Sequence, residues 1–155
     1  MNVIKKLDQY DEKCVFFCEP IKNNIMNDGN FIRILYSNEL FVLNGIYLIF
    51  SINSMNVEKY YNKYKITFDK QANNDIIEQI RIIEENIIKK ICIKNKTPQF
   101  KIYEQLKNGN IKIFFEHKDD IITMNNTFLL KISGIWDTDM SYGVTYKFIK
   151  INLTI

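Results

Sequence analysis

The 155-residue chain has few of the residue types on which catalysis most often depends. It has one histidine, one tryptophan and three cysteines, and no glycine-rich phosphate loop of either standard spacing. The histidine, His117, lies in the segment FFEHKDD, and nothing near it in the sequence indicates a nucleophile and base arranged as a triad. We therefore expect no enzymatic activity and no cofactor.

The cysteines and acidic pairs do not indicate a metal site or a disulfide framework. Cys14, Cys18 and Cys92 are odd in number, so we expect reduced thiols in an intracellular compartment. Cys14 and Cys18 flank a strand-like run from which their thiols would diverge, which argues against zinc. Asp137 and Asp139 form one compact acidic pair, whereas a metal-dependent nuclease needs more carboxylates. A metal-dependent hydrolase remains a third interpretation that metal analysis would test.

Long apolar runs are also missing. The longest run, residues 40–52, is interrupted by Asn44 and Gly45 and is shorter than the ~20 residues that a membrane helix needs. The N-terminal segment has no apolar signal core. We expect a soluble intracellular protein without a membrane partner, located in the cytoplasm or nucleus of an infected host if the source is a virus.

The composition is that of a globular protein. Apolar residues make up 46% and charged residues 25% of the chain, and the length suits one domain over residues 1–155. Ala72 is the only alanine, while Ile, Asn, Lys and Tyr are in excess, which indicates AT-rich codons rather than an activity.

Short apolar runs separated by Asn, Asp and Gly turns predict strands over residues 14–17, 31–36, 40–43, 46–52, 64–68, 111–115, 127–136 and 144–148. From residue 75 to 91, isoleucines recur at three- and four-residue spacing, which predicts a helix, and Asp75 with Glu78 resembles a capping box. The expected fold is α+β and mostly β: a small OB-like antiparallel barrel with one main helix, about 75–91, packed on it.

The C-terminal segment 131–151 predicts a hairpin with two different faces. Simple alternation of side chains along the first strand assigns five residues to the core: Phe128, Leu130, Ile132, Gly134 and Trp136. It assigns to the other face Leu129, Lys131, Ser133 and Ile135, joined by Thr145 and Lys147 of the partner strand. Gly134 within a strand indicates a bulge, a barrel corner or the close approach of another backbone.

The sequence Gly134-Ile135-Trp136, a short polar loop and Gly143-Val144-Thr145-Tyr146-Lys147-Phe148 resembles the closing hairpin of small viral single-stranded DNA-binding proteins. These are the proteins of large nucleocytoplasmic DNA viruses and, more distantly, phage T7-type proteins. The preceding helix and Lys96-Thr97-Pro98 are also similar, so the resemblance covers roughly residues 75–151.

The resemblance implies an OB fold and single-stranded DNA binding in viral DNA replication or repair. Single-stranded DNA is then the expected partner, with RNA as an alternative, and replication proteins or a second copy of the chain are further partners. The phage-type proteins end in an acidic tail that contacts replication partners, whereas this chain ends in KINLTI. Partner recruitment would therefore use another surface.

Charge and aromatic residues support the same interpretation. Between residues 89 and 112 there are seven lysines and one acidic residue, Glu104, which is typical of a phosphate-binding surface with little base preference. Tyrosines and lysines also alternate from residue 60 to 65, and stacking of a base on a ring contributes about 1–3 kcal/mol. The predicted nucleic-acid-binding residues are Tyr60, Tyr61, Lys63, Tyr64, Lys65, Lys94, Lys96, Lys101, Lys107, Lys112, Lys131, Trp136, Tyr142 and Lys147.

Structural explanations exist for each of these features. Trp136 and Tyr146 are also typical of a barrel core, the tyrosine and lysine cluster suits an edge strand, and the lysine-rich segment suits an ordinary solvated surface. The rival function is that of a structural or interaction protein, such as a virion component or a replication-complex subunit, whose sheet edge and isoleucine-rich helix pack on a partner.

Overall fold

The computed structural model of the protein describes residues 4–22, 29–114 and 126–151. Two short 3-10 helices, Leu7–Gln9 and Glu12–Cys14, lie near the N-terminus. The other elements are β1 (Lys5–Lys6), β2 (Val15–Phe17), β3 (Ile21–Lys22), β4 (Asn30–Ser37), β5 (Val42–Asn44), β6 (Ile46–Ser51), β7 (Met55–Tyr60), β8 (Lys63–Phe68), α1 (Asn74–Ile91), β9 (Thr97–Gln99), α2 (Lys101–Lys107), β10 (Asn110–Phe114), β11 (Thr127–Asp137) and β12 (Ser141–Lys150).

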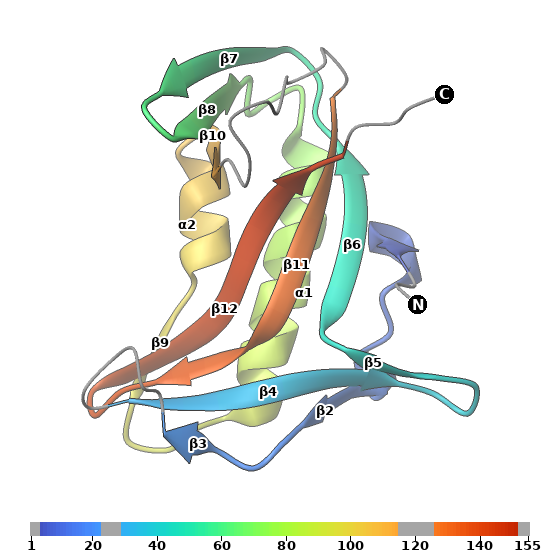
Figure 1. The fold of residues 1–155 in the computed structure, drawn as a ribbon, viewed down its shortest axis with the longest axis vertical. Coiled ribbons are helices and arrows are strands. Elements are labelled where there is room, and N and C mark those ends of the chain that lie inside the picture. The colour runs from blue at the N-terminus through green and yellow to red at the C-terminus, as the bar shows by residue number, and fades with distance from the viewer. Residues whose placement is uncertain (1–3, 23–28, 115–125, 152–155) are drawn as a thin grey trace.

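Strand β11 is the centre of the main sheet (Figure 1). Its antiparallel neighbour on one side is β12, while its other side is shared by β6, which pairs with residues 127–132, and by β4, which pairs with residues 134–137. Strands β1 and β9 add short parallel pairs to β6 and β12, and β2, β3 and β5 pair with β4.

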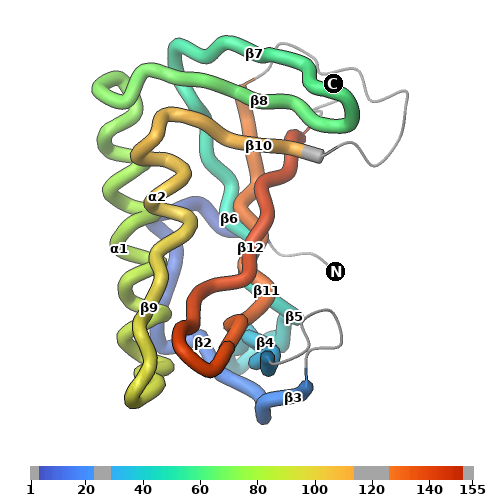
Figure 2. Tube along the Cα trace, turned by 90° about the vertical axis from the view of Figure 1, so that its left-hand side faces the viewer, coloured from blue at the N-terminus to red at the C-terminus, as the bar shows by residue number. Residues whose placement is uncertain are grey.

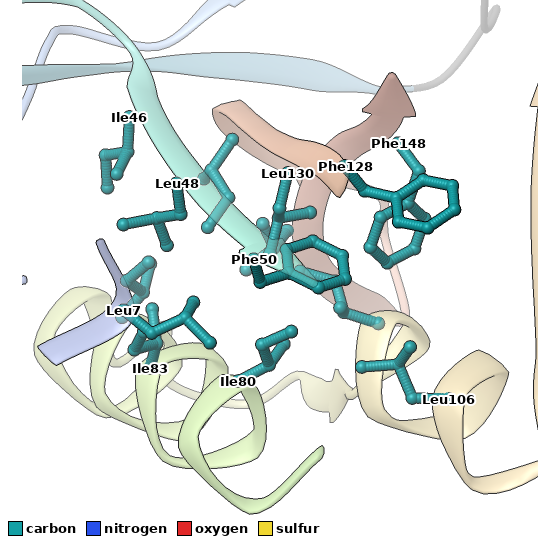
Figure 3. Packing of buried hydrophobic residues seen from close by; sticks show 14 of the residues in the cluster. Leu7, Ile46, Leu48, Phe50, Ile80, Ile83, Leu106, Phe128, Leu130 and Phe148 are labelled. Carbon is teal, nitrogen blue, oxygen red and sulfur yellow. The ribbon is translucent and has the colours of Figure 1, made fainter. Parts of the chain in front are cut away.

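Both helices lie on one side of this sheet, as Figure 2 shows for β6, β11 and β12. Alternation along the strands places Leu48, Phe50 and Leu130 toward the helices, and Figure 3 shows these side chains packed between the two layers. Helix α1 buries its isoleucine stripe against them, through Ile77, Ile80, Ile83, Ile87 and Ile88. Burial of one isoleucine side chain contributes roughly 1.5–3 kcal/mol, so this interface stabilises the packing of α1 on the sheet.

A second, smaller sheet of β7, β8 and β10 lies across one end of the main sheet (Figures 1 and 2). The three strands are antiparallel, with Ile66 of β8 opposite both Val57 and Ile111. Ile66 and Ile111 are fully buried and belong to the common core. On the opposite face, Lys65 of β8 lies between Glu58 of β7 and Lys112 of β10.

The predicted OB-like barrel is wrong. The fold is mostly β, as expected, but the described strands form sheets of nine and three strands that do not close into a barrel, and there are two helices. A barrel buries its apolar face by closing the sheet on itself. Here the isoleucine stripe of α1 covers that face instead.

Of the three alternatives that Gly134 indicated, the structure shows a bulge next to it, and this bulge changes which side chains share a face. The register between β11 and β12 shifts between Ile132 and Gly134, so the alternation changes phase at that point. Ile132 and Ile135 are both buried, and Trp136 lies on the face opposite the helices. Simple alternation is therefore wrong in assigning Gly134 and Trp136 to the core set and Ile135 to the other face.

The predicted main helix is confirmed by α1, but its predicted capping box is wrong. The residue before the helix is Asn73, not a residue that bonds the first turn through its side chain. The buried amide of Asn73 instead accepts the N–H of Asn53 at 2.7 Å and donates to the carbonyl of Asn53 at 2.8 Å. These two hydrogen bonds hold the segment that follows β6 against the residue that precedes α1.

Candidate nucleic-acid interface

The face of the main sheet that points away from α1 and α2 is called the open face below. Strand alternation and cross-strand register define it, because residues directly opposite each other project to the same side. Its residues are Phe31, Arg33 and Leu35 of β4, Tyr47, Ile49 and Ser51 of β6, Thr127, Leu129, Lys131, Gly134 and Trp136 of β11, and Gly143, Thr145, Lys147 and Ile149 of β12.

Two predicted lysines lie next to each other on the open face. Lys131 of β11 is directly opposite Lys147 of β12 and, on its other side, opposite Tyr47 of β6. The Nζ atom of Lys131 is 5.6 Å from the centroid of the Tyr47 ring, and Lys147 is exposed. Residues far apart in the sequence thus form one cationic row with a ring at its end.

A second cationic and aromatic pair lies further along the same face. The Cζ atom of Arg33 is 5.9 Å from the centroid of the Phe31 ring, and the Nη1 atom of Arg33 donates to the side-chain oxygen of Asn44 at 2.8 Å. Sequence reasoning missed Arg33, Phe31 and Tyr47. Their positions depend on how β4 and β6 pair with β11, which no local pattern indicates.

Among the residues that define the open face there is no aspartate or glutamate, whereas Arg33, Lys131 and Lys147 are cationic. The helix side differs, because Glu78, Glu85 and other acidic residues lie there. An anion would therefore be attracted to the open face, and over distances shorter than the Debye length of about 8 Å at physiological salt this attraction is only partly screened.

Four more predicted residues, Tyr60, Lys63, Lys65 and Lys112, lie on the outer face of the small sheet. Lys65 is directly opposite Lys112 on one side and Glu58 on the other, and Lys63 is opposite Tyr60. The hydroxyl of Tyr60 donates to Glu58 at 2.9 Å, and this bond raises the pKa of the phenol. The outer face is thus a mixed patch rather than a purely cationic one.

The remaining residues of the tyrosine and lysine cluster have different surroundings. Tyr61 lies in the turn of the β7–β8 hairpin, is 99% exposed, and has a φ of 34°, which is rare for a residue other than glycine. Tyr64 projects to the opposite face from Lys65 and is half-buried. The cluster is therefore divided between the two faces and the turn.

The other predicted residues do not join the open face. Lys101 and Lys107 are exposed on α2, on the helix side, and Lys94 is exposed in the connection from α1 to β9. Lys96 is half-buried, and its Nζ atom forms an ion pair with Asp137 at 2.5 Å. Tyr142 is 5% exposed, which leaves its ring no face for a stacked base.

The described residues include neither a metal-binding cluster nor a membrane-spanning helix. Within residues 4–22, 29–114 and 126–151, no group of three or more His, Cys, Asp or Glu side chains could hold a metal ion. The same part of the chain contains no helix with the length and apolar character needed to cross a membrane. His117 lies outside the described residues.

The open face of the main sheet is therefore where the structure brings predicted residues together, namely Lys131, Trp136 and Lys147. The small sheet separately gathers Tyr60, Lys63, Lys65 and Lys112, whereas Lys101 and Lys107 lie on α2. No protein-family model, curated protein or solved structure matches the chain.

Proposed function

We propose that this protein binds single-stranded nucleic acid on the open face with little sequence preference. The observation that supports the proposal is the arrangement of Arg33, Lys131 and Lys147 beside the rings of Tyr47, Phe31 and Trp136, on a face whose defining residues include no acid. Cations next to rings are the two elements that single-strand binding requires.

Each element has its own role. Lysine acts as a point charge toward phosphate, and binding releases the counterions condensed on the nucleic acid. The rings offer a surface to bases, which is usable only when the bases are unpaired, because bases in a duplex are already stacked on each other. Neither contact distinguishes one base from another, so low sequence preference follows.

A binding titration with matched charge variants tests the proposal. Fluorescence anisotropy of labelled oligo-dT measures affinity at about 50 mM and about 200 mM salt, a range over which phosphate-dependent binding weakens strongly. The test variant is Lys131→Glu with Lys147→Glu. The control is Lys94→Glu with Lys107→Glu, which changes the net charge by the same amount at exposed positions away from the open face.

The proposal predicts that the test variant binds much more weakly and that the control is close to wild type. The salt dependence should also fall, by roughly 1.4 in the slope of log K against log salt, since each single-strand phosphate contact contributes about 0.7. Equal losses in the two variants would mean that only net charge matters. No binding of wild type at low salt would overturn the proposal.

A protein-interaction role is the second candidate, and exposed apolar residues at two sheet edges favour it. Ile21 on β3 is 54% exposed and Val42 on β5 is 67% exposed, and both strands are edges of the described sheet. Short exposed edge strands are sites at which another chain can add a strand. Size-exclusion chromatography with light scattering, before and after nuclease treatment, would show association that does not depend on nucleic acid.

A further inference from the structure

We propose that Phe31 and Trp136 form the base-stacking platform of the open face, and that Gly134 and Gly143 leave the space that these two rings occupy. This inference rests on the proposed function. The amines of Lys131 and Lys147 then hold phosphates further along the same strands. The bound segment would run along β11 and β12 rather than across the sheet.

The first ring occupies the place of a missing side chain. A Cβ atom built at Gly134 would lie 2.6 Å from Cζ and 2.7 Å from Cε2 of Phe31, and 2.3 Å from the carbonyl oxygen of Ile32. Real Cβ atoms essentially never approach other atoms so closely. The Phe31 ring therefore leans across β11 toward the backbone of Gly134 instead of standing away from the sheet.

The second ring repeats this arrangement one strand further on. Trp136 is directly opposite Gly143, and a Cβ atom at Gly143 would lie 2.7 Å from Cζ2 and 2.9 Å from Cε2 of the indole. Phe31 is in turn directly opposite Trp136, so the two residues are cross-strand neighbours. The indole lies over the residue directly opposite it, whereas the Phe31 ring lies over Gly134, which is diagonal to it. Trp136 remains partly exposed, so part of the ring is accessible.

The cations lie at regular steps from this platform. Arg33 is in register with Gly134 and, through it, with Thr145, which lies two residues from Gly143 along β12. Lys147 lies four residues from Gly143 along the same strand. At about 3.3 Å per residue these steps correspond to about 7 Å and about 13 Å. A short unpaired segment could stack its bases on the platform and place successive phosphates near Arg33 and then between Lys131 and Lys147.

The single tryptophan of the chain provides a direct readout, since all indole fluorescence comes from Trp136. Titration with oligo-dT should quench the emission as a base stacks on the ring. Inorganic polyphosphate, an anion without bases, should compete with oligo-dT in the anisotropy assay but leave the emission unchanged. Quenching by both ligands to the same extent would overturn the platform.

Ring variants provide the second readout. Phe31→Leu keeps an apolar side chain and the tryptophan signal, and Trp136→Leu removes the indole. Each should weaken oligo-dT binding by about 5- to 150-fold, the range measured for loss of one stacking ring. The control, Phe100→Leu, removes a ring from the helix side and should bind like wild type. Circular dichroism confirms that each variant is folded.

The outcomes separate this inference from the proposed function. Binding of oligo-dT with unchanged emission, and with Phe31→Leu as tight as wild type, would overturn the stacking platform while leaving the charge-dependent function in place. Failure of wild type to bind oligo-dT in the anisotropy assay would overturn both.

Discussion

The carboxylate of Glu84, in the middle of α1, accepts the backbone N–H of Ile102 at 2.9 Å. Its second oxygen accepts the N–H of Tyr103, also at 2.9 Å. These N–H groups belong to the first turn of α2, where no partner exists within the helix. A fully buried side chain of one helix therefore caps the other, and it fixes how α2 lies against the sheet.

Replacement of Glu84 by alanine should destabilise the protein by about 2–4 kcal/mol, because two buried N–H groups would lose their acceptor. Glu85→Ala is the matched control: Glu85 is exposed and pairs with Arg81 on the surface, so its loss should cost less than about 1 kcal/mol. Urea denaturation measures both. Similar midpoints for the two variants would contradict the capping role.

Burial raises the pKa of Glu84 above its ordinary value of 4.5, although the two N–H donors oppose the shift and Glu85 and Glu104 add to it. The folded state thus holds the proton more tightly than the unfolded state, and ionisation of Glu84 reduces stability. The contribution is fully present below pH 4.5 and is lost as the pH rises through the raised pKa. Relative to Glu84→Gln, the unfolding free energy of wild type should therefore fall as the pH rises toward neutral. Parallel pH profiles in urea titrations would rule this out.

Substitution of Gly134 by alanine should destabilise the protein by about 1–3 kcal/mol, the usual cost of overpacking. The added methyl group would meet the Phe31 ring and the carbonyl of Ile32 at distances that the backbone cannot accept without moving. Thermal unfolding measures the change. The control, Ser133→Ala, alters the neighbouring residue without adding volume, and an equal loss there would show that the bulge itself, and not the ring, is sensitive.

Loss of the amine of Lys96 should reduce stability rather than nucleic-acid affinity. Asp137 is buried, so Lys96→Met would leave a carboxylate without its cation, at a cost of about 1–3 kcal/mol. Lys94→Met, at an exposed position two residues away, should be nearly neutral. If Lys96→Met keeps its stability but loses oligo-dT binding, the ion pair is not the role of Lys96.

How far the sequence predicts this fold depends on how local each signal is. Helix α1 was predictable because its isoleucines repeat with the helical period over 18 residues. Strands β1, β3 and β9 have two or three residues each and exist only through their pairing partners, and β7 has a largely polar sequence. Whether the sheet closes into a barrel was not predictable from the sequence. A strand shows the same alternation of apolar residues whether a helix or another part of the sheet covers its apolar face.

The candidate site shows the same limit. Lys131 and Lys147 were predictable as neighbours because one hairpin contains both. A bulge at Gly134 was one of three alternatives that the sequence allowed, and only the register of β11 with β12 shows that it moves Trp136 to the open face. Glu84 had a detectable signal, a carboxylate four residues from both Ile80 and Ile88 on the buried stripe, although its partners in α2 could not be inferred.

Because β4 and β6 share one edge of β11, the main sheet depends on a strand near the end of the sequence, and this affects how the chain folds. Leu48 pairs with Leu130, and Ile32 pairs with Ile135, so β4 and β6 cannot form their ladders with β11 until the last third of the chain has been synthesised. Contacts of such long sequence separation slow folding, because loop closure precedes any gain from pairing. The nascent chain should therefore leave the ribosome with β4 and β6 not yet joined through β11, and assembly of the whole main sheet should be a late, cooperative event.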